Sequence, residues 1–468
     1  MEKTKQTNKY QGKTRKDFEL LLPAGSYEKA MYAIEFGADA IYCGIPMFTL
    51  RGKSTMSMED LKKIVPYAHK KGVKVYFAVN IFPHSFKYDQ FLKDMKTMVE
   101  EIKPDAFIMA DPGLIDQTLE HFPTATIHLS VQQNNVNWMS ANFWYKLGIT
   151  RVILARELTL KEVQIIHQKV PKIELEFFIH GSNCMAYSGR CLLSNYMNYR
   201  DSNQGVCNNA CRFKYKVYKS DNPEAMEPLQ SQAYKQVEKG TYFVEEQKRK
   251  GELYEISEDD TGTYIFNAKD NCMAEHLEKL IDAGVLSFKV EGRTKSVYYA
   301  SIVARTYRKL FDQILSGEKP DIDWAIKELN TTSNRGFMPG FLEGNPKSHA
   351  QDYEKKTSHQ THVFAGLVKK VINSSKTEST LEIETRAKFS KGDTLEFITP
   401  TKIFKWECDK ITRQKLNKKT KKTETVELNS VSGGLEYNIQ IKVPFEIKNE
   451  YCVIRRELTK EEYEKAEF

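Results

Sequence analysis

The chain has 468 residues, of which 40% are hydrophobic and 28% are charged, a composition typical of soluble globular proteins. Lysine and arginine outnumber the acidic residues by 70 to 62, a mild excess that by itself indicates solubility and no particular partner. No run of about eighteen apolar residues is present and residues 1–16 do not resemble a secretion signal, so we expect a cytosolic protein without a membrane span.

The first predicted element is a basic, disordered arm at residues 1–16. A large domain follows at residues 17–345, where short apolar runs alternate with amphipathic stretches of helical period. Eight such runs indicate a parallel sheet covered by helices, and the number eight favours an α/β fold of the (β/α)8 TIM-barrel type. An open doubly wound sheet is the competing fold, although no GxGxxG motif follows the first run. The runs are ELLLP (19–23), ADAIYCG (38–44), VKVYFAVN (73–80), DAFIMAD (105–111), ATIHLS (125–130), RVILAR (151–156), IELEFFIHG (173–181) and LSFKVEG (286–292).

Polar residues stand at the ends of most of these runs, where the active site of a (β/α)8 barrel lies. They include Asn80, Gln132, Asn134, Arg156, His180, Glu291 and Arg293. Loops are polar in any case, but the repetition over most strands predicts a polar pocket for an anionic, hydroxyl-bearing or nucleotide ligand. In that pocket Arg156 and Arg293 are candidate clamps for a carboxylate or phosphate.

Five of the eight cysteines lie between His180 and the eighth apolar run, at Cys184, Cys191, Cys207, Cys211 and Cys272. Their spacing does not match the paired C-x2-C pattern of structural zinc sites, but thiols from a loop and a separate segment suit an iron–sulfur cluster. A nucleophilic Cys184 paired with His180 is the alternative, and it leaves the other cysteines unexplained. The remaining three cysteines, in apolar strand patterns, are predicted to be core residues: Cys43, Cys408 and Cys452.

About 100 residues separate the seventh and eighth runs. They hold the cysteine-rich loop (180–215) and a polar insertion (219–262), which is typical of a functional or disordered loop. A polar linker (346–361) leads to alternating segments at 362–456 that predict a small C-terminal all-β barrel domain, followed by a tail at 457–468. The stretch KLNKKTKK (415–422) is a candidate contact for nucleic-acid phosphates or simply a solvated hairpin tip.

The segment EFFIHGSNCMAYSGRCLLS (176–194) resembles the signature of the collagenase-like peptidase family of unknown catalytic type. That family includes prephenate-dependent tRNA hydroxylation proteins, an rRNA cytidine hydroxylation protein and shorter iron–sulfur proteins of ubiquinone synthesis. Asn183 departs from the pattern, which usually has an apolar residue there. The C-terminal module resembles that of the longer, tRNA-hydroxylating members. Similar blocks extend over nearly the whole chain: LLLPAG, AIYCG, NYRDSNQGVCNNACRF, NAKDNC, FKVEGRTKSVYYA and NRGFMPGF.

The resemblance implies an iron–sulfur enzyme that converts the wobble uridine of tRNA to 5-hydroxyuridine, with prephenate as co-substrate. A 4Fe-4S cluster would be held by Cys184, Cys191, Cys207 and Cys272. Cys211 is a fifth candidate, and whether it takes the place of Cys207 stays open. A peptidase acting on extended peptides and an RNA-binding factor with a structural cluster are the alternatives. The electron donor and a need for a paralogous subunit stay open.

The candidate site residues follow from the strand ends and the resemblance together. The catalytic set is His180, Arg156, Glu176, Glu291 and Arg293. The set for binding substrate is Asn80, Gln132, Asn134, Tyr187, Arg190 and Arg200. Three tyrosines of the cysteine-rich loop are candidates for stacking on an extruded uridine: Tyr187, Tyr196 and Tyr199.

Overall fold

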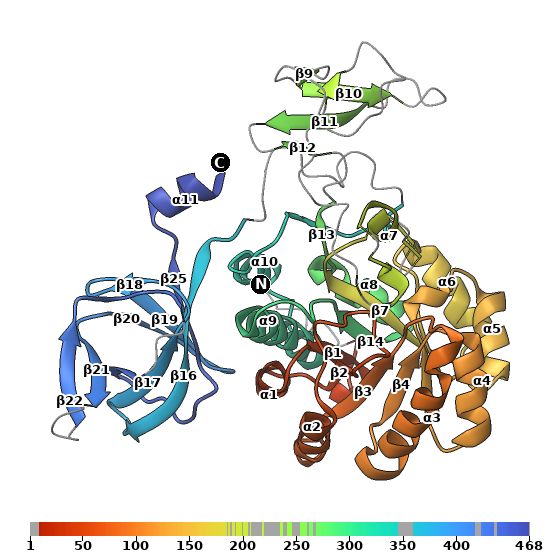
Figure 1. Ribbon diagram of the computed structural model, residues 1–468, viewed down its shortest axis with the longest axis horizontal. Helices are drawn as coiled ribbons and strands as arrows, with labels where there is room; N and C mark the ends of the chain where they lie inside the picture. Colours follow the sequence, from red (N-terminus) through yellow and green to blue (C-terminus); the bar gives the residue numbers. More distant parts are fainter. Residues whose placement is uncertain are drawn as a thin grey trace, which may run out of the picture.

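A computed structural model shows a helix-covered barrel joined to an all-β domain (Figure 1). It describes residues 9–184, 268–344, 359–416, 423–434 and 438–467, together with parts of the segment between 186 and 264. Cys207, Cys211 and Tyr199 lie outside the described residues, as do most of the basic stretch 415–422 and of the linker 346–361.

Eight parallel strands form the barrel, and it closes because the last strand pairs with both the first and the seventh. Nearly every strand residue is buried, as expected for a parallel sheet that is covered on its outer face and filled on its inner face. The (β/α)8 prediction is confirmed, and each of the eight strands lies within one residue of a predicted run. The strands are β1 (Glu19–Ala24), β2 (Ala40–Gly44), β3 (Lys74–Val79), β4 (Ala106–Met109), β5 (Ile127–Leu129), β6 (Arg151–Ile153), β7 (Glu174–Gly181) and β14 (Val285–Val290).

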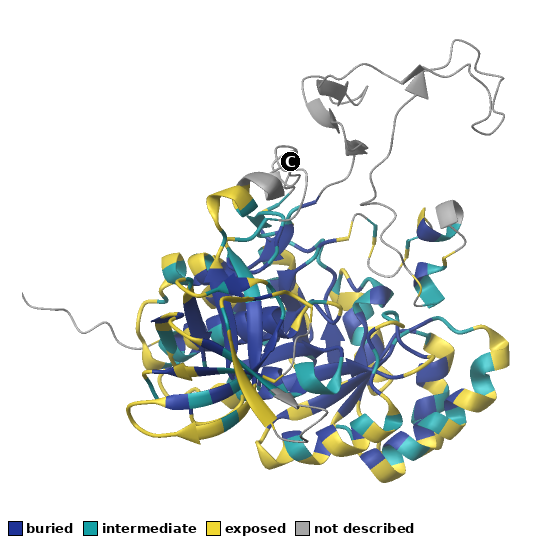
Figure 2. Cartoon of the chain, turned by 60° about the vertical axis from the view of Figure 1, so that its left-hand side comes forward, coloured by how far each residue is buried: buried dark blue, intermediate teal, exposed yellow. Residues whose placement is uncertain are grey.

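Helices surround the barrel and place their apolar faces against the strands, leaving the outer faces exposed (Figure 2). Most begin at a side chain that accepts a hydrogen bond from a backbone N–H of the first turn, such as Ser26, Asp111 and Thr159. The helices are α1 (Tyr27–Glu35), α2 (Met58–Lys70), α3 (Tyr88–Thr97), α4 (Pro112–His121), α5 (Trp138–Lys146), α6 (Leu160–Lys169), α8 (Leu277–Asp282), α9 (Val297–Ser316) and α10 (Ile322–Leu329).

The long connection between β7 and β14 returns to the barrel through a short strand, β13 (Asp270–Cys272). This strand runs antiparallel to the end of β7, with Cys272 opposite His180, and parallel to β15 (Phe337–Met338). Earlier in the connection lie α7 (Leu193–Asn198) and the strand pieces β8 (Tyr218–Lys219), β9 (Lys235–Gln236), β10 (Thr241–Glu245), β11 (Leu253–Asp259) and β12 (Gly262–Tyr264).

The C-terminal domain is all-β, as predicted, and its main sheet has eight antiparallel strands around a separate apolar core. Within the described residues β20 and β22 are the two edges of this sheet. The strands are β16 (His362–Ser374), β17 (Ser379–Thr385), β19 (Thr394–Ile398), β20 (Ile403–Glu407), β21 (Ile411–Leu416), β22 (Thr423–Leu428), β24 (Ile439–Val443) and β25 (Val453–Glu457). A small pair, β18 (Phe389–Ser390) and β23 (Ser430–Val431), and helix α11 (Lys460–Glu467) complete it.

The two domains share a buried polar contact beside α10. Arg455 of β25 donates from Nη2 to Glu328 at 2.9 Å and from Nε to Glu396 at 2.7 Å, so one guanidinium joins α10 to β19. Residues 9–16 of the arm that was expected to be disordered also contact the barrel: the side chain of Tyr10 is buried, and its hydroxyl donates to Asp282 at 3.2 Å. In the described part of the chain, no helix is both long and apolar enough to cross a membrane.

Candidate functional site at the carboxyl end of the barrel

Cationic side chains from three loops surround one carboxylate at the carboxyl end of the barrel. Arg51, in the loop after β2, lies 3.6 Å from the Glu291 carboxylate in the loop after β14. Arg156 follows β6, and its guanidinium stacks 3.7 Å from the centre of the Phe178 ring. Arg293 donates from Nη1 to Thr49 Oγ1 at 2.6 Å. The predicted residues Arg156, Glu291 and Arg293 therefore meet, and the structure adds Arg51.

Glu291 and the three arginines are largely buried, so their charges change one another's pKa values. Burial raises the pKa of the Glu291 carboxyl, but Arg51, Arg156 and Arg293 lower it more, so the carboxylate stays ionised. Burial also lowers the pKa values of Arg156 and Arg293. Since an arginine remains charged at any physiological pH, the cluster is a preformed cationic surface suited to a planar anion such as a carboxylate.

Two glycines make room for Arg293. A Cβ atom on Gly25 would lie 1.9 Å from the carbonyl oxygen of Arg293, and one on Gly44 would lie 2.3 Å from its Nη1. Both distances are far inside van der Waals contact, so any side chain there would displace the arginine. The glycines of the LLLPAG and AIYCG blocks are therefore explained by the close packing of the arginine-bearing loop against β1 and β2.

The three predicted amides Asn80, Gln132 and Asn134 lie at this end of the barrel and differ in their hydrogen bonding. Asn80 accepts from the backbone N–H of Leu50 at 3.2 Å, and Gln132 accepts from Ser130 Oγ at 2.8 Å and donates to the carbonyl of Asn80. These two amides hold loops together. Asn134 has left-handed backbone geometry (φ 48°), and its side-chain nitrogen and oxygen are buried without a hydrogen-bond partner in the described part of the chain. A buried amide without a partner is costly, so Asn134 is the amide best placed to serve a ligand or water.

His180, at the end of β7, lies in an aromatic enclosure. Its ring centre is 5.4–5.9 Å from those of Tyr299, Tyr307 and Phe337, and its Nδ1 is 3.3 Å from the Tyr307 hydroxyl. Burial, with a smaller contribution from Lys295, lowers the pKa of His180 to about 3, so the imidazole is neutral and a weak base. Among the described residues no hydrogen bond joins His180 to the exposed thiol of Cys184. The geometry of a cysteine–histidine pair is therefore not formed here.

The described cysteines of the predicted cluster differ in burial. Cys184 is exposed, Cys191 is half-buried, and Cys272 is buried with its thiol 3.5 Å from the Tyr307 hydroxyl. No three His, Cys, Asp or Glu side chains of the described residues converge closely enough to hold a metal ion, and the fourth predicted ligand lies outside them. The ligand set stays a prediction. The three cysteines expected in apolar cores are buried there: Cys43, Cys408 and Cys452.

The remaining predicted binding residues belong to the same loop. Arg190 is exposed and donates from Nε to the carbonyl of Gln132 at 3.4 Å, which brings the loop over the end of β5. Tyr187 is 61% exposed, as stacking on a base requires. Arg200 is exposed, and its described hydrogen bond is from its backbone N–H to Ser194 at 3.2 Å.

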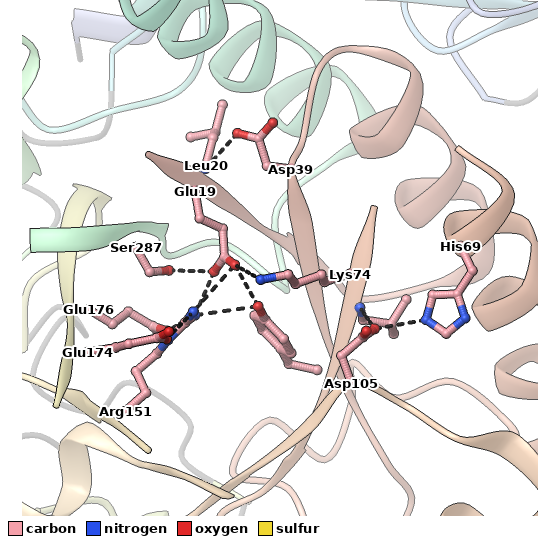
Figure 3. A network of polar contacts seen from close by, with 12 residues as sticks. Glu19, Leu20, Asp39, His69, Lys74, Asp105, Arg151, Glu174, Glu176 and Ser287 are labelled. Carbon is pink, nitrogen blue, oxygen red and sulfur yellow. Dashed lines mark hydrogen bonds and ion pairs between the residues drawn. The ribbon is translucent and has the colours of Figure 1, made fainter. Parts of the chain in front are cut away.

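Glu176 lies lower in the barrel, away from the cationic cluster. Its carboxylate accepts from Lys289 Nζ at 2.7 Å and lies 3.4 Å from Arg151 Nη1, and its side chain is fully buried. Figure 3 shows that Arg151 also reaches Glu19, so Glu176 belongs to an ionic network that fills the amino-terminal half of the barrel. This end of a (β/α)8 barrel usually serves stability. Lys289 connects the network to the mouth, because its ammonium lies 4.1 Å from the centre of the Tyr42 ring.

Two family models match the chain: that of peptidase family U32 over residues 25–352 and that of the peptidase family U32 C-terminal domain over residues 360–455. The tRNA hydroxylation protein P of Escherichia coli is 38% identical over 95% of this chain and 97% of its own length. The protein of the same name from Haemophilus influenzae is 39% identical over 94% and 96%. The Escherichia coli 23S rRNA 5-hydroxycytidine C2501 synthase is 33% identical over 65% of this chain and 40% of its own.

Proposed function

Because the chain belongs to peptidase family U32, we propose that it is an RNA-modifying enzyme that hydroxylates the wobble uridine of tRNA at C5, with prephenate as co-substrate. The observation that carries the proposal is the 38–39% identity, over nearly the full length of both chains, to two proteins named for tRNA hydroxylation. A third relative is named as an RNA 5-hydroxycytidine synthase, so hydroxylation of a pyrimidine recurs among its relatives.

The cationic cluster suits the co-substrate. Prephenate carries two carboxylates, and arginine forms paired hydrogen bonds with a carboxylate. In the proposal Arg51, Arg156 and Arg293 bind these carboxylates, and Glu291 keeps the guanidinium groups apart and oriented. Asn134 supplies an amide donor and acceptor, which is the hydrogen-bonding pattern that the edge of a uracil base requires.

The reaction needs a redox group as well. Replacing the hydrogen on C5 of uracil by a hydroxyl group is a two-electron oxidation of the base, and ordinary side chains do not accept those electrons. When bound, an iron–sulfur cluster would pass these two electrons one at a time to an external electron acceptor. We therefore include in the proposal a 4Fe-4S cluster on Cys184, Cys191, Cys207 and Cys272, for which the support is the thiol donor set and the family resemblance.

The cluster is tested by the iron content and visible absorbance of protein purified without oxygen. We expect about four iron atoms per chain and thiolate-to-iron absorbance near roughly 400 nm, both lost in serine variants of the four cysteines. Cys408→Ser is the matched control, because this thiol is buried in the core of the C-terminal domain. Retained iron in Cys207→Ser together with its loss in Cys211→Ser would assign Cys211 instead, and colourless, iron-free protein would contradict the cluster.

The activity is tested by mass spectrometry of tRNA nucleosides from a deletion strain that carries either the wild-type gene or a variant. We expect 5-hydroxyuridine derivatives to disappear on deletion and to return with the wild-type gene. Arg51→Ala and Arg293→Lys should restore at most a tenth of the wild-type level, since each loses a carboxylate contact of about 1.5–3 kcal/mol. Lys53→Ala, an exposed cation of the same loop as Arg51, should restore it fully. Unchanged nucleosides on deletion would refute the proposal.

The peptidase alternative has less support, because His180 is enclosed by aromatic rings and is not hydrogen-bonded to Cys184 among the described residues. It requires peptide hydrolysis by iron-free protein that is abolished by Cys184→Ala alone, whereas our proposal requires no hydrolysis. An RNA-binding factor with a structural cluster would instead retain tRNA affinity and yield no hydroxylated product under anaerobic turnover.

A further inference from the structure

Helix α5 lies on the side of the barrel opposite the C-terminal domain (Figure 1), and its outer face carries exposed apolar side chains. Met139, Phe143 and Leu147 follow one another at intervals of four residues, so they form one stripe, and they are 60%, 57% and 47% exposed. Trp138 and Tyr145, at 36% exposure each, lie on the other edge of the outer face of the helix. We call the stripe and these two residues together the α5 face. So many large apolar side chains side by side on one helix are unusual for a monomer.

The α5 face is nearly free of charge, although 28% of the chain is charged. The single ionisable side chain of the helix besides Tyr145 is Lys146, which is exposed on the same outer face in the last turn. Interface centres are depleted in charged residues and enriched in aromatic residues and methionine, which is the composition found here. An RNA partner would require cationic side chains among the aromatic ones, so the composition favours a protein partner.

The helices on either side of α5 carry exposed charges of opposite sign. On α4 the exposed pair at a spacing of four residues is acidic, Asp116 and Glu120. On α6 the exposed residues at the same spacing are Lys161, Ile165 and Lys169, and Ile165 is 37% exposed. The exposed charges next to the α5 face are thus acidic on α4 and mainly basic on α6, where the one exposed acid, Glu162, accepts hydrogen bonds from Thr159 at the start of the helix.

This arrangement is self-complementary. If a two-fold axis runs along α5, two copies of the helix lie side by side in the same direction, and α4 of each copy faces α6 of the other. The acids then meet the lysines twice, while the apolar stripes fill the centre. With the axis across α5, α4 would face α4 and like charges would meet. We propose that the chain forms a two-fold homodimer through the α5 face, with α4 of each copy opposite α6 of its partner.

The arrangement of apolar and charged residues suits such a contact. A stable interface buries about 800 Å² per partner, with an apolar centre and a polar rim. The five residues of the α5 face together with Ile165 form the centre, and the charged residues of α4 and α6 form the rim. The C-terminal domain lies on the far side of the barrel and stays clear of the contact (Figure 1).

The dimer is tested by sedimentation equilibrium of the full-length protein between about 0.5 and 50 μM, a range that covers micromolar dissociation constants. We expect wild-type dimer, and at least 100-fold weaker association in Phe143→Glu, because burying an unpaired carboxylate opposite its own symmetry copy is strongly unfavourable. Phe86→Glu is the matched control, since Phe86 is 81% exposed and lies outside the α5 face. Circular dichroism verifies that each variant is folded. A wild-type monomer throughout, or an unchanged dimer in Phe143→Glu, overturns the proposal.

Charge reversal tests the orientation. Lys161→Glu with Lys169→Glu should weaken the dimer at least fivefold, since acids would then face Asp116 and Glu120 of the partner copy. Adding Asp116→Lys and Glu120→Lys should restore wild-type association, because each rim then again meets the opposite sign. Failure of the fourfold variant to recover, while folded, overturns the proposed orientation. A wild-type protein that stays monomeric alone but binds a different protein through Phe143 assigns the α5 face to that partner.

Discussion

Arg151→Met should be among the most destabilising substitutions in the barrel, because it removes the cation at the centre of the ionic network (Figure 3). The side chain of Arg151 is 2% exposed and lies 2.6 Å from Glu19 and 2.7 Å from Glu174. Methionine fills a similar volume without a charge. The substitution would leave the carboxylates of Glu19 and Glu176 in a dry interior with fewer partners.

Two independent magnitudes agree for this change. Removing one partner of a buried ion pair typically costs about 3–5 kcal/mol. Burial raises the pKa of Glu19, but Arg151 together with Tyr76 and Lys74 lowers it from 4.5 to about 2. A depression of this size corresponds to about 3 kcal/mol of stability. That stability is present above pH 4.5 and is lost as the pH falls from 4.5 towards 2, because protonation of Glu19 removes the ion pair.

Urea unfolding followed by circular dichroism measures both effects. We expect the free energy of unfolding at pH 7 to fall by about 3–5 kcal/mol in Arg151→Met, and the difference from wild type to shrink below pH 4.5. Glu19→Gln combined with Arg151→Met should cost less than the two single changes together, by about 1–3 kcal/mol. Lys172→Ala, an exposed cation nearby in sequence, should change stability by less than about 0.5 kcal/mol. A cost below about 1 kcal/mol in Arg151→Met, or strict additivity, would refute the reasoning.

Three further expectations follow from packing. Arg455→Ala removes the guanidinium that binds both Glu328 and Glu396, so it should lower the free energy of unfolding by about 3 kcal/mol. An unchanged urea midpoint would contradict this. Gly181→Ala places a Cβ 2.5 Å from the Glu291 carbonyl at a φ of 106°, whereas at Gly72 nothing lies within 4 Å. Gly181→Ala should therefore lower the free energy of unfolding by about 1–3 kcal/mol more than Gly72→Ala does. It should also reduce 5-hydroxyuridine in the complemented strain. Tyr10→Ala should lower the free energy of unfolding by about 2–3 kcal/mol, because Tyr10 is buried, while Lys9→Ala should lower it by less than about 0.5 kcal/mol. Thermal unfolding measures both, and no change in Tyr10→Ala would show that the arm is detached from the barrel in solution.

Much of the fold could be predicted from the sequence, because its signals are local. Parallel strands buried on both faces read as continuous apolar runs, such as the one that became β3, and the helices between them begin at capping side chains. The prediction that the sheet closes into a barrel depended on the number of runs, which is eight. The pairing of β14 with both β1 and β7 confirms this prediction.

The site was predictable in part. Arg156, Glu291 and Arg293 come directly after strands, and the carboxyl ends of parallel strands necessarily meet at one edge, so their proximity followed from chain order. Arg51 was missed because it lies seven residues beyond β2, where only the path of the loop decides what it faces. Its position in a loop at that same edge was the one signal available. Glu176 was placed with the catalytic residues, yet its position two residues into β7 puts it in the lower half of the barrel.

By itself, the sequence determined the strand and helix pattern, the two-domain order and the family, since these depend on periodicity and motifs along the chain. Only the tertiary structure decided which polar groups are used and which are left over. It joined Glu19 to Arg151 across 132 residues, enclosed His180 in aromatic rings, and left the amide of Asn134 without a described partner. The physical reason is that hydrogen bonding and burial depend on neighbours that are distant in the sequence, and no local pattern specifies them.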